Sequence, residues 1–175
     1  MSAAETHIQL DSLTKFQIFE GLDPEQIQPF AERFRLLETG ANETILKEGE
    51  PGESLFLLLE GEVEVTQALT MQMVRKPEID GREKAIIRLK AEQHPFFGEM
   101  SMFTEQDTRT ATIRSVIKCR LAEIHRDDFF AVIKDQPDIG IVTLENIARV
   151  LVDRLKKTNN DVIKLTTALA IILEK

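Results

Sequence analysis

The sequence predicts a mainly β domain, folded as a sandwich, roll or barrel, with short helices before it and a long helix after it. Three observations lead to this expectation. Short segments of strand character recur between residues 35 and 124. Glycine-containing turns separate several of these segments at an even spacing. Helical periodicity of 3.6 residues precedes this region and returns after it, and the later pattern runs from about residue 138 to the end.

Two short helices are expected ahead of the strands, whereas residues 1–10 show no periodicity. The first helix is expected at residues 12–19, where three apolar side chains share one face. The second is expected to begin at Pro24 with Asp23 as its cap, because proline suits the first helical turn and an aspartate before it accepts backbone N–H groups.

Seven segments have the length and alternation of strands. They are residues 35–38, 44–47, 54–59, 62–66, 84–90, 110–116 and 120–124. Residues 74–82 carry polar and turn-forming side chains and are expected to form an exposed hairpin loop. A short helix is expected at 127–133, ending before Pro137. The chain is therefore divided into a β domain with short helices, residues 1–135, and a C-terminal helix, residues 136–175.

Composition limits the classes of function. The 175 residues include 42% hydrophobic side chains, enough for a core, and the formal net charge of −8 argues against a nucleic-acid or anionic-membrane surface. No apolar run reaches the roughly 18 residues of a membrane span. The N-terminus has no basic start and no apolar signal region, so cytoplasmic residence is expected. Cys119 lies in an apolar-alternating run and is expected to be buried without a disulfide partner.

Residues 96–112 carry the strongest chemical signal. Two phenylalanines precede Gly98 and Glu99, and Arg109 follows ten residues after the carboxylate, between small hydroxyl residues. A glycine lets the backbone approach a ligand, and an arginine holds two oxygens of a phosphate with its planar fork. A carboxylate would repel a phosphate, so Glu99 is expected to accept hydrogen bonds from a neutral group such as a sugar hydroxyl. The segment indicates a site for a small molecule that carries both a phosphate and a ribose.

This segment resembles the phosphate-binding cassette of cyclic-nucleotide-binding domains, and the ten-residue spacing is similar to that of the bacterial catabolite activators. The resemblance implies an eight-stranded β-roll, a double-stranded β-helix or jelly roll, with a long C-terminal dimerisation helix. It implies that Gly98 donates backbone N–H to a phosphate, that Glu99 accepts from the ribose 2′-hydroxyl, and that Arg109 binds the phosphate. The implied ligand-binding residues are Phe97, Gly98, Glu99, Met100, Ser101, Arg109, Thr110, Ala111, Thr158 and Asn159.

The C-terminal helix carries a heptad seam, which predicts a parallel coiled-coil homodimer. Its members, spaced alternately by four and three, are Leu144, Ala148, Leu151, Leu155, Thr158, Val162, Leu165, Leu169 and Ile172. The helix is expected to be about 45 Å long, too long for a small roll to cover. A helix packed only on its own domain is the alternative. Thr158 is the polar member of the seam, and the resemblance implies that Thr158 and Asn159 meet the purine base, the latter from the other subunit.

The leading hypothesis is a dimeric, non-catalytic bacterial sensor module that binds a cyclic purine nucleotide, cAMP in preference to cGMP. Thr110 directly after Arg109 also resembles cGMP-dependent kinases, so a cGMP-selective sensor stays open. An adaptor dimer with a vestigial pocket is a second alternative, favoured by Ser101 and by the lack of a proline before Arg109. His7, His94 and His125 lack metal-ligand spacing, so a metal enzyme is not expected, and no cofactor is. The chain lacks the helix-turn-helix module of the catabolite activators, so DNA binding is not expected.

Overall fold

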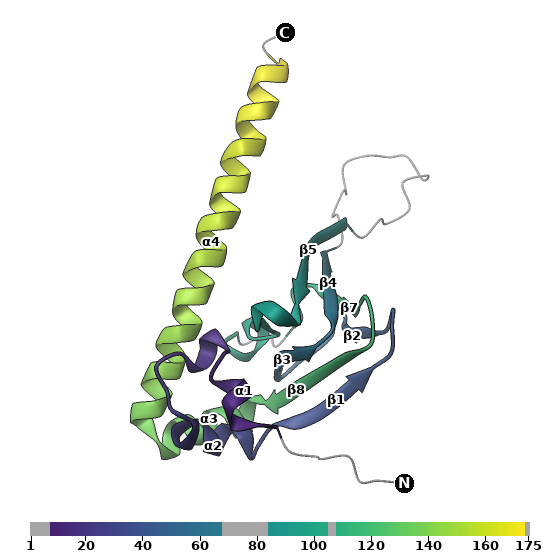
Figure 1. Cartoon of the computed structure of the whole chain (residues 1–175). Helices are drawn as coiled ribbons and strands as arrows, with labels where there is room; N and C mark the ends of the chain where they lie inside the picture. Colours follow the sequence, from purple (N-terminus) through teal and green to yellow (C-terminus); the bar gives the residue numbers. More distant parts are fainter. Residues whose placement is uncertain (1–7, 68–83, 105–107, 174–175) are drawn as a thin grey trace.

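The computed structural model describes residues 8–67, 84–104 and 108–173. In this part of the chain eight strands form a roll of two four-stranded antiparallel sheets, with helices at one side (Figure 1). The strands are β1 (Arg35–Thr39), β2 (Thr44–Leu46), β3 (Ser54–Glu60), β4 (Glu62–Gln67), β5 (Lys84–Lys90), β6 (Phe96–Phe97), β7 (Thr112–Ser115) and β8 (Cys119–His125). The α-helices are α1 (Leu10–Leu13), α2 (Pro24–Ala31), α3 (Arg126–Asp135) and α4 (Pro137–Leu173), and the 3₁₀ turns are η1 (Gln17–Phe19), η2 (Ala91–Gln93) and η3 (Met100–Met102).

The strand order is β1-β8-β3-β6 in one sheet and β2-β7-β4-β5 in the other. Strand β3 is almost wholly apolar because its two faces fill two different cores. Its Phe56 and Leu58 belong to the core inside the roll, together with side chains of the second sheet. Its Leu55 and Leu57 belong to the core between the first sheet and the helices. Cys119 is buried in the core inside the roll, as predicted.

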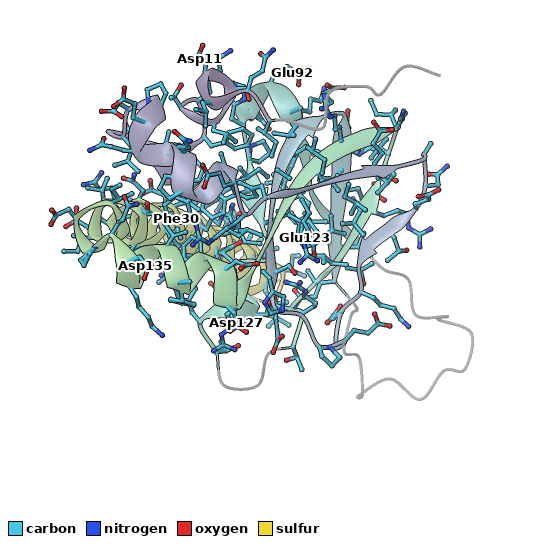
Figure 2. The ribbon with its side chains drawn as sticks, turned by 90° about the horizontal axis from the view of Figure 1, so that it is seen from below. Asp11, Phe30, Glu92, Glu123, Asp127 and Asp135 are labelled. Carbon is cyan, nitrogen blue, oxygen red and sulfur yellow. The ribbon has the colours of Figure 1, made fainter. Side chains whose placement is uncertain are left out.

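The helices pack on the outer face of the first sheet. Phe30 of α2 points toward α3, where its ring lies 5.6 Å from that of Phe129 (Figure 2). Helix α2 begins as expected, with Pro24 in its first turn and a capping box between Asp23 and Gln26. The two phenylalanines pack α2 against α3, and the cap fixes the residue at which α2 begins.

The prediction of one helix over residues 12–19 is wrong. Helix α1 ends at Leu13, Phe16 has extended backbone angles, and η1 follows. Leu13, Phe16 and Phe19 are nevertheless all buried in the core that the helices share with β3. Burial of these three side chains, and not continuous helical hydrogen bonding, accounts for their spacing. The hairpin loop predicted at residues 74–82 lies outside the described residues.

Helix α4 has a packed beginning and a projecting remainder (Figure 1). Its 37 residues span roughly 55 Å, of which the four heptads of the seam account for the roughly 45 Å expected from the sequence. Near its start, Asn146 is buried and its Nδ2 donates to the carbonyl oxygens of Ile18, at 3.3 Å, and Glu20, at 2.8 Å. From Leu155 onward the helix is exposed. Within the described residues, no helix combines the length and hydropathy that a membrane crossing requires.

At Gly140, α4 lies in close contact with α3. A Cβ at this position would lie 2.7 Å from Cγ2 and 3.0 Å from Cα of Ile133. We predict that Gly140→Ala lowers the free energy of unfolding by about 1–3 kcal/mol, because the two helices must separate. Alanine should otherwise favour a helix by up to about 1 kcal/mol. Urea unfolding of Gly140→Ala and of the exposed control Asn160→Ala tests this, and a stabilised Gly140→Ala protein would contradict the packing.

Candidate functional site

A cavity of about 320 Å³ lies between the roll and α4, within the range of about 300–1,000 Å³ that is usual for small-molecule sites. Apolar side chains of the roll form much of its wall: Leu46, Val65, Ile87, Leu89, Phe97 and Ile113. The segment 96–112, called the cassette below, also lines the cavity with Gly98, Glu99, Met100, Ser101, Arg109, Thr110 and Ala111. Helix α4 contributes Arg154, Lys157, Thr158 and Asp161. Nine of the ten predicted site residues thus line one cavity, and Asn159 does not.

Arg109 is buried at the wall of this cavity. Its Nη1 donates to the carbonyl oxygen of Ser54 at 2.8 Å, to that of Gly98 at 3.0 Å and to Oγ of Ser101 at 2.8 Å. Burial lowers the pKa of Arg109 from its ordinary value, and the nearby charges of Glu123 and Glu99 oppose that shift. The guanidinium stays protonated at neutral pH, because its ordinary pKa lies so far above 7. All three bonds come from Nη1, so among the described residues Nη2 is not committed.

Two glycines make room for the Arg109 side chain. A Cβ at Gly52 would collide with Nε of Arg109. Gly98 has a φ of +83°, and a Cβ there would lie 2.7 Å from the carbonyl oxygen of Ser54 and 2.9 Å from Nη1 of Arg109. The sequence suggested that Gly98 serves close approach of a ligand. The structure adds that Gly98 is required for the arginine to lie where it does.

Ser101 has a defined role in this arrangement. Its hydroxyl accepts from Arg109 and donates to the carbonyl oxygen of Gly98 at 3.1 Å. It therefore bridges the arginine and the backbone of the cassette. Thr110 lines the cavity beside Arg109, and its hydroxyl donates to Sδ of Met100 at 3.5 Å. This is a weak bond on an exposed side chain, so the hydroxyl is readily available to a ligand.

Glu99 is buried and paired with an arginine of α4 that the sequence did not single out. Nη1 of Arg154 donates to Oε1 of Glu99 at 2.7 Å, and Nη2 donates to the carbonyl oxygen of Phe96 at 2.8 Å. The Arg154 guanidinium also lies over the Phe96 ring, 5.2 Å from its centroid. Arg154 thus connects the cassette to the helix at three points. In the sequence, Arg154 could have been found from its position one helical turn before Thr158, which was a predicted site residue.

Thr158 and Asn159 differ in where they lie. The Thr158 hydroxyl donates to the carbonyl oxygen of Arg154 at 3.0 Å, so it already has a partner within its own helix and its oxygen can still accept. Asn159 follows about 100° further around the helix, since an α-helix has 3.6 residues per turn. That rotation places it away from the cavity of its own chain, toward the side that carries Leu155 and Val162.

The fold and the cavity define a ligand-binding β-roll domain with a helix across its site. The family model of the cyclic nucleotide-binding domain matches residues 36–136, more than half of the chain. This chain therefore belongs to the cyclic nucleotide-binding domain family.

Known relatives agree with this assignment. A CRP-like cAMP-activated global transcriptional regulator of Mycobacterium tuberculosis is 29% identical over 153 residues, covering 87% of this chain and 61% of the relative. The Thermus thermophilus catabolite activator protein has a TM-score of 0.71 at 24% identity, covering 86% of this chain and 63% of that chain. The regulatory domain of Toxoplasma gondii PKA, crystallised with cAMP, has a TM-score of 0.58 at 25% identity, covering 72% and 43%. These neighbours confirm the predicted β-roll with flanking helices, and the chain spans about three fifths of the first relative.

The Glu99–Arg154 pair yields a prediction about stability. Glu99 is only 2% exposed and the Arg154 side chain 43%, so the pair is intermediate between surface and buried pairs. We predict that Arg154→Met lowers the free energy of unfolding by about 2 kcal/mol, because the buried carboxylate loses its partner. In a Glu99→Gln background the same change should cost less than about 1 kcal/mol.

The matched control is Arg120→Met, which breaks an exposed pair with Glu60 at 3.4 Å and should cost less than about 1 kcal/mol. Urea unfolding of the four variants in this cycle measures the coupling. Equal costs of Arg154→Met in the two backgrounds would mean that Glu99 and Arg154 do not interact.

Proposed function

We propose that this chain is a cyclic-nucleotide sensor module that binds cAMP in the cavity, forms a homodimer through α4 and signals through the position of that helix. One observation carries the proposal: a buried arginine and a buried carboxylate line the same cavity, and among the described residues neither Nη2 of Arg109 nor Oε2 of Glu99 has a hydrogen-bond partner. A phosphate suits the first group, and a neutral hydroxyl suits the second. A ribose phosphate carries both.

The chemistry of each contact follows from the groups present. Nη2 of Arg109 and the backbone N–H of Gly98 would bind the phosphate oxygens, with the Thr110 hydroxyl beside them. The net charge of −8 repels an anion at long range, so these local donors must supply the affinity. Glu99 would accept from the ribose 2′-hydroxyl. The Ser101 bond to Arg109 speaks against a vestigial pocket, because it keeps the arginine in a defined position.

The preference for cAMP over cGMP rests on α4. Because the Thr158 hydroxyl donates to Arg154, its oxygen is left as an acceptor. The exocyclic group at position 6 of adenine is an amine that donates, whereas guanine carries an acceptor oxygen there. An acceptor in the wall of the cavity therefore favours adenine. The named cAMP-activated regulator and the cAMP-bound PKA regulatory domain among the relatives support the same choice.

The signalling step would be a population shift of α4. Glu99 binds Arg154 of α4 in the structure, and the ribose hydroxyl would donate to the same carboxylate. Ligand and helix therefore share one acceptor, so the ligand changes the free energy of the helix position. The Mycobacterium tuberculosis relative is named as a transcriptional regulator and the Toxoplasma gondii neighbour as a regulatory domain, which supports a non-catalytic module. Cytoplasmic residence and the lack of DNA binding by this segment remain part of the proposal.

We predict that Arg109→Ala weakens cAMP binding by about one to two orders of magnitude, because charge-assisted bonds to the phosphate are lost. The control is Arg120→Ala, which removes an arginine from the surface of β8 and should leave affinity unchanged. Displacement of a fluorescent cyclic nucleotide measures both variants. If Arg109→Ala binds cAMP and cGMP as tightly as the natural sequence, the cavity is not the binding site.

The exposed seam of α4 supports the dimer. Leu155, Val162, Leu165, Leu169 and Ile172 are each more than half exposed in the single chain, and their heptad spacing suits a partner helix. Such a row of apolar side chains costs free energy in water unless a second surface covers it.

We predict that Leu165→Lys dissociates the homodimer, whereas Ile163→Lys does not. The two side chains are 71% and 62% exposed in the single chain, so they are matched in exposure, but only Leu165 belongs to the seam. Sedimentation equilibrium should give a dimer for the natural sequence and for Ile163→Lys. A dimer that survives Leu165→Lys, or a natural sequence that sediments as a monomer, would exclude the seam as the interface.

A further inference from the structure

Four polar side chains of α4 form one stripe along the cavity. Arg154, Lys157, Thr158 and Asp161 stand at i, i+3, i+4 and i+7, so they share a face of the helix, and all four line the cavity. The proposed function uses Arg154 and Thr158 but gives no role to Lys157 and Asp161. A charged donor and a charged acceptor, one helical turn apart, thus face the same cavity.

Neither of these two charges is saturated within the described residues. The structure shows ion pairs for the neighbouring Lys156, with Asp153 at 3.6 Å, and for Lys164, with Asp161 at 3.3 Å. It shows none for Lys157 among the described residues. The Lys164 pair uses only Oδ1 of Asp161, and the Asp161 side chain is about half exposed. Lys157 and Asp161 therefore keep a donor and an acceptor available to a ligand.

Their place along the helix points to the base of the ligand. Arg154 meets Glu99, the group assigned to the ribose, and Lys157 and Asp161 lie roughly one and two turns beyond it, at about 5.4 Å per turn. The apolar side chains Val65, Ile87 and Leu89 line the same cavity and suit the flat faces of a purine. A base held there would present its polar edge to one face of α4.

We propose that Lys157 and Asp161 determine base specificity by reading the polar edge of the purine. This inference rests on the proposed function. The 6-amino group of adenine has two N–H bonds: one donates to the Thr158 oxygen, as in the proposed function, and Asp161 accepts the other. Lys157 donates to ring nitrogen N1. Adenine offers one donor and one acceptor side by side on this edge, which an ammonium and a carboxylate from adjacent turns can match.

Ligand analogues separate the two contacts. Asp161→Ala should weaken binding of cAMP about tenfold, the loss expected for a bond to a charged group. The same variant should lose less than about twofold for the cyclic monophosphate of purine riboside, which lacks the 6-amino group. Lys157→Ala should weaken both ligands about tenfold, because both contain N1. Thermal unfolding without ligand should be unchanged in both variants, since both residues are exposed.

The matched controls are Asp153→Ala and Lys156→Ala, which remove the same charges from the same helix outside the cavity and should leave binding unchanged. Two outcomes would overturn the inference, because each would mean that affinity falls only through the change in net charge. One is an equal loss of affinity in the controls, and the other is an equal loss for both ligands in Asp161→Ala. Unaltered affinity in Asp161→Ala and Lys157→Ala would overturn it while the proposed function stands. A natural sequence that binds no cyclic nucleotide would overturn both.

Discussion

A guanidinium buried in a β-roll must be surrounded by acceptors, and this requirement organises the site. Arg109 meets it with the carbonyl oxygens of Ser54 and Gly98 and the hydroxyl of Ser101. Those acceptors come from β3 and from the cassette, and a side chain at Gly52 or Gly98 would displace the arginine. The roll therefore holds a permanent positive charge at one fixed point of a cavity. An anionic ligand gains from this preorganisation, because the arginine is already ordered and partly desolvated before it binds.

Glu99 extends the same site to the helix. It follows Gly98 in the chain, yet its partner Arg154 comes from α4, so the cassette and the helix meet at one carboxylate. Helix α4 is anchored at its start by buried side chains such as Asn146 and Ile147, and it projects free of the roll further on. Glu99 contacts α4 at Arg154, which lies between the buried beginning of the helix and the exposed residues of its seam. Under the proposed function, a ligand bound at Glu99 would act through α4 on the proposed dimer interface.

The local parts of this structure were predictable from the sequence, and the long-range contacts were not. The cassette residues from Phe97 to Ala111 lie close together in the chain, so their spacing in the sequence was enough to predict this part of the site. Arg154 lies 55 residues from Glu99, and no local pattern shows such a pairing in advance. The expected helix at residues 12–19 was wrong because its apolar residues have helical spacing without forming one helix. They have this spacing because all of them are buried in a shared core. Asn159 was assigned to the site by resemblance alone, and in a single chain it faces elsewhere.

Calorimetric titration of the purified chain with cAMP, and separately with cGMP, tests the central claim most directly. The buried arginine and carboxylate predict a saturable heat with about one cAMP per chain, and the Thr158 acceptor on α4 predicts weaker binding of cGMP. No measurable heat with either nucleotide at concentrations up to about 1 mM, where the binding free energy would be weaker than about −4 kcal/mol, would contradict a nucleotide site between the roll and α4.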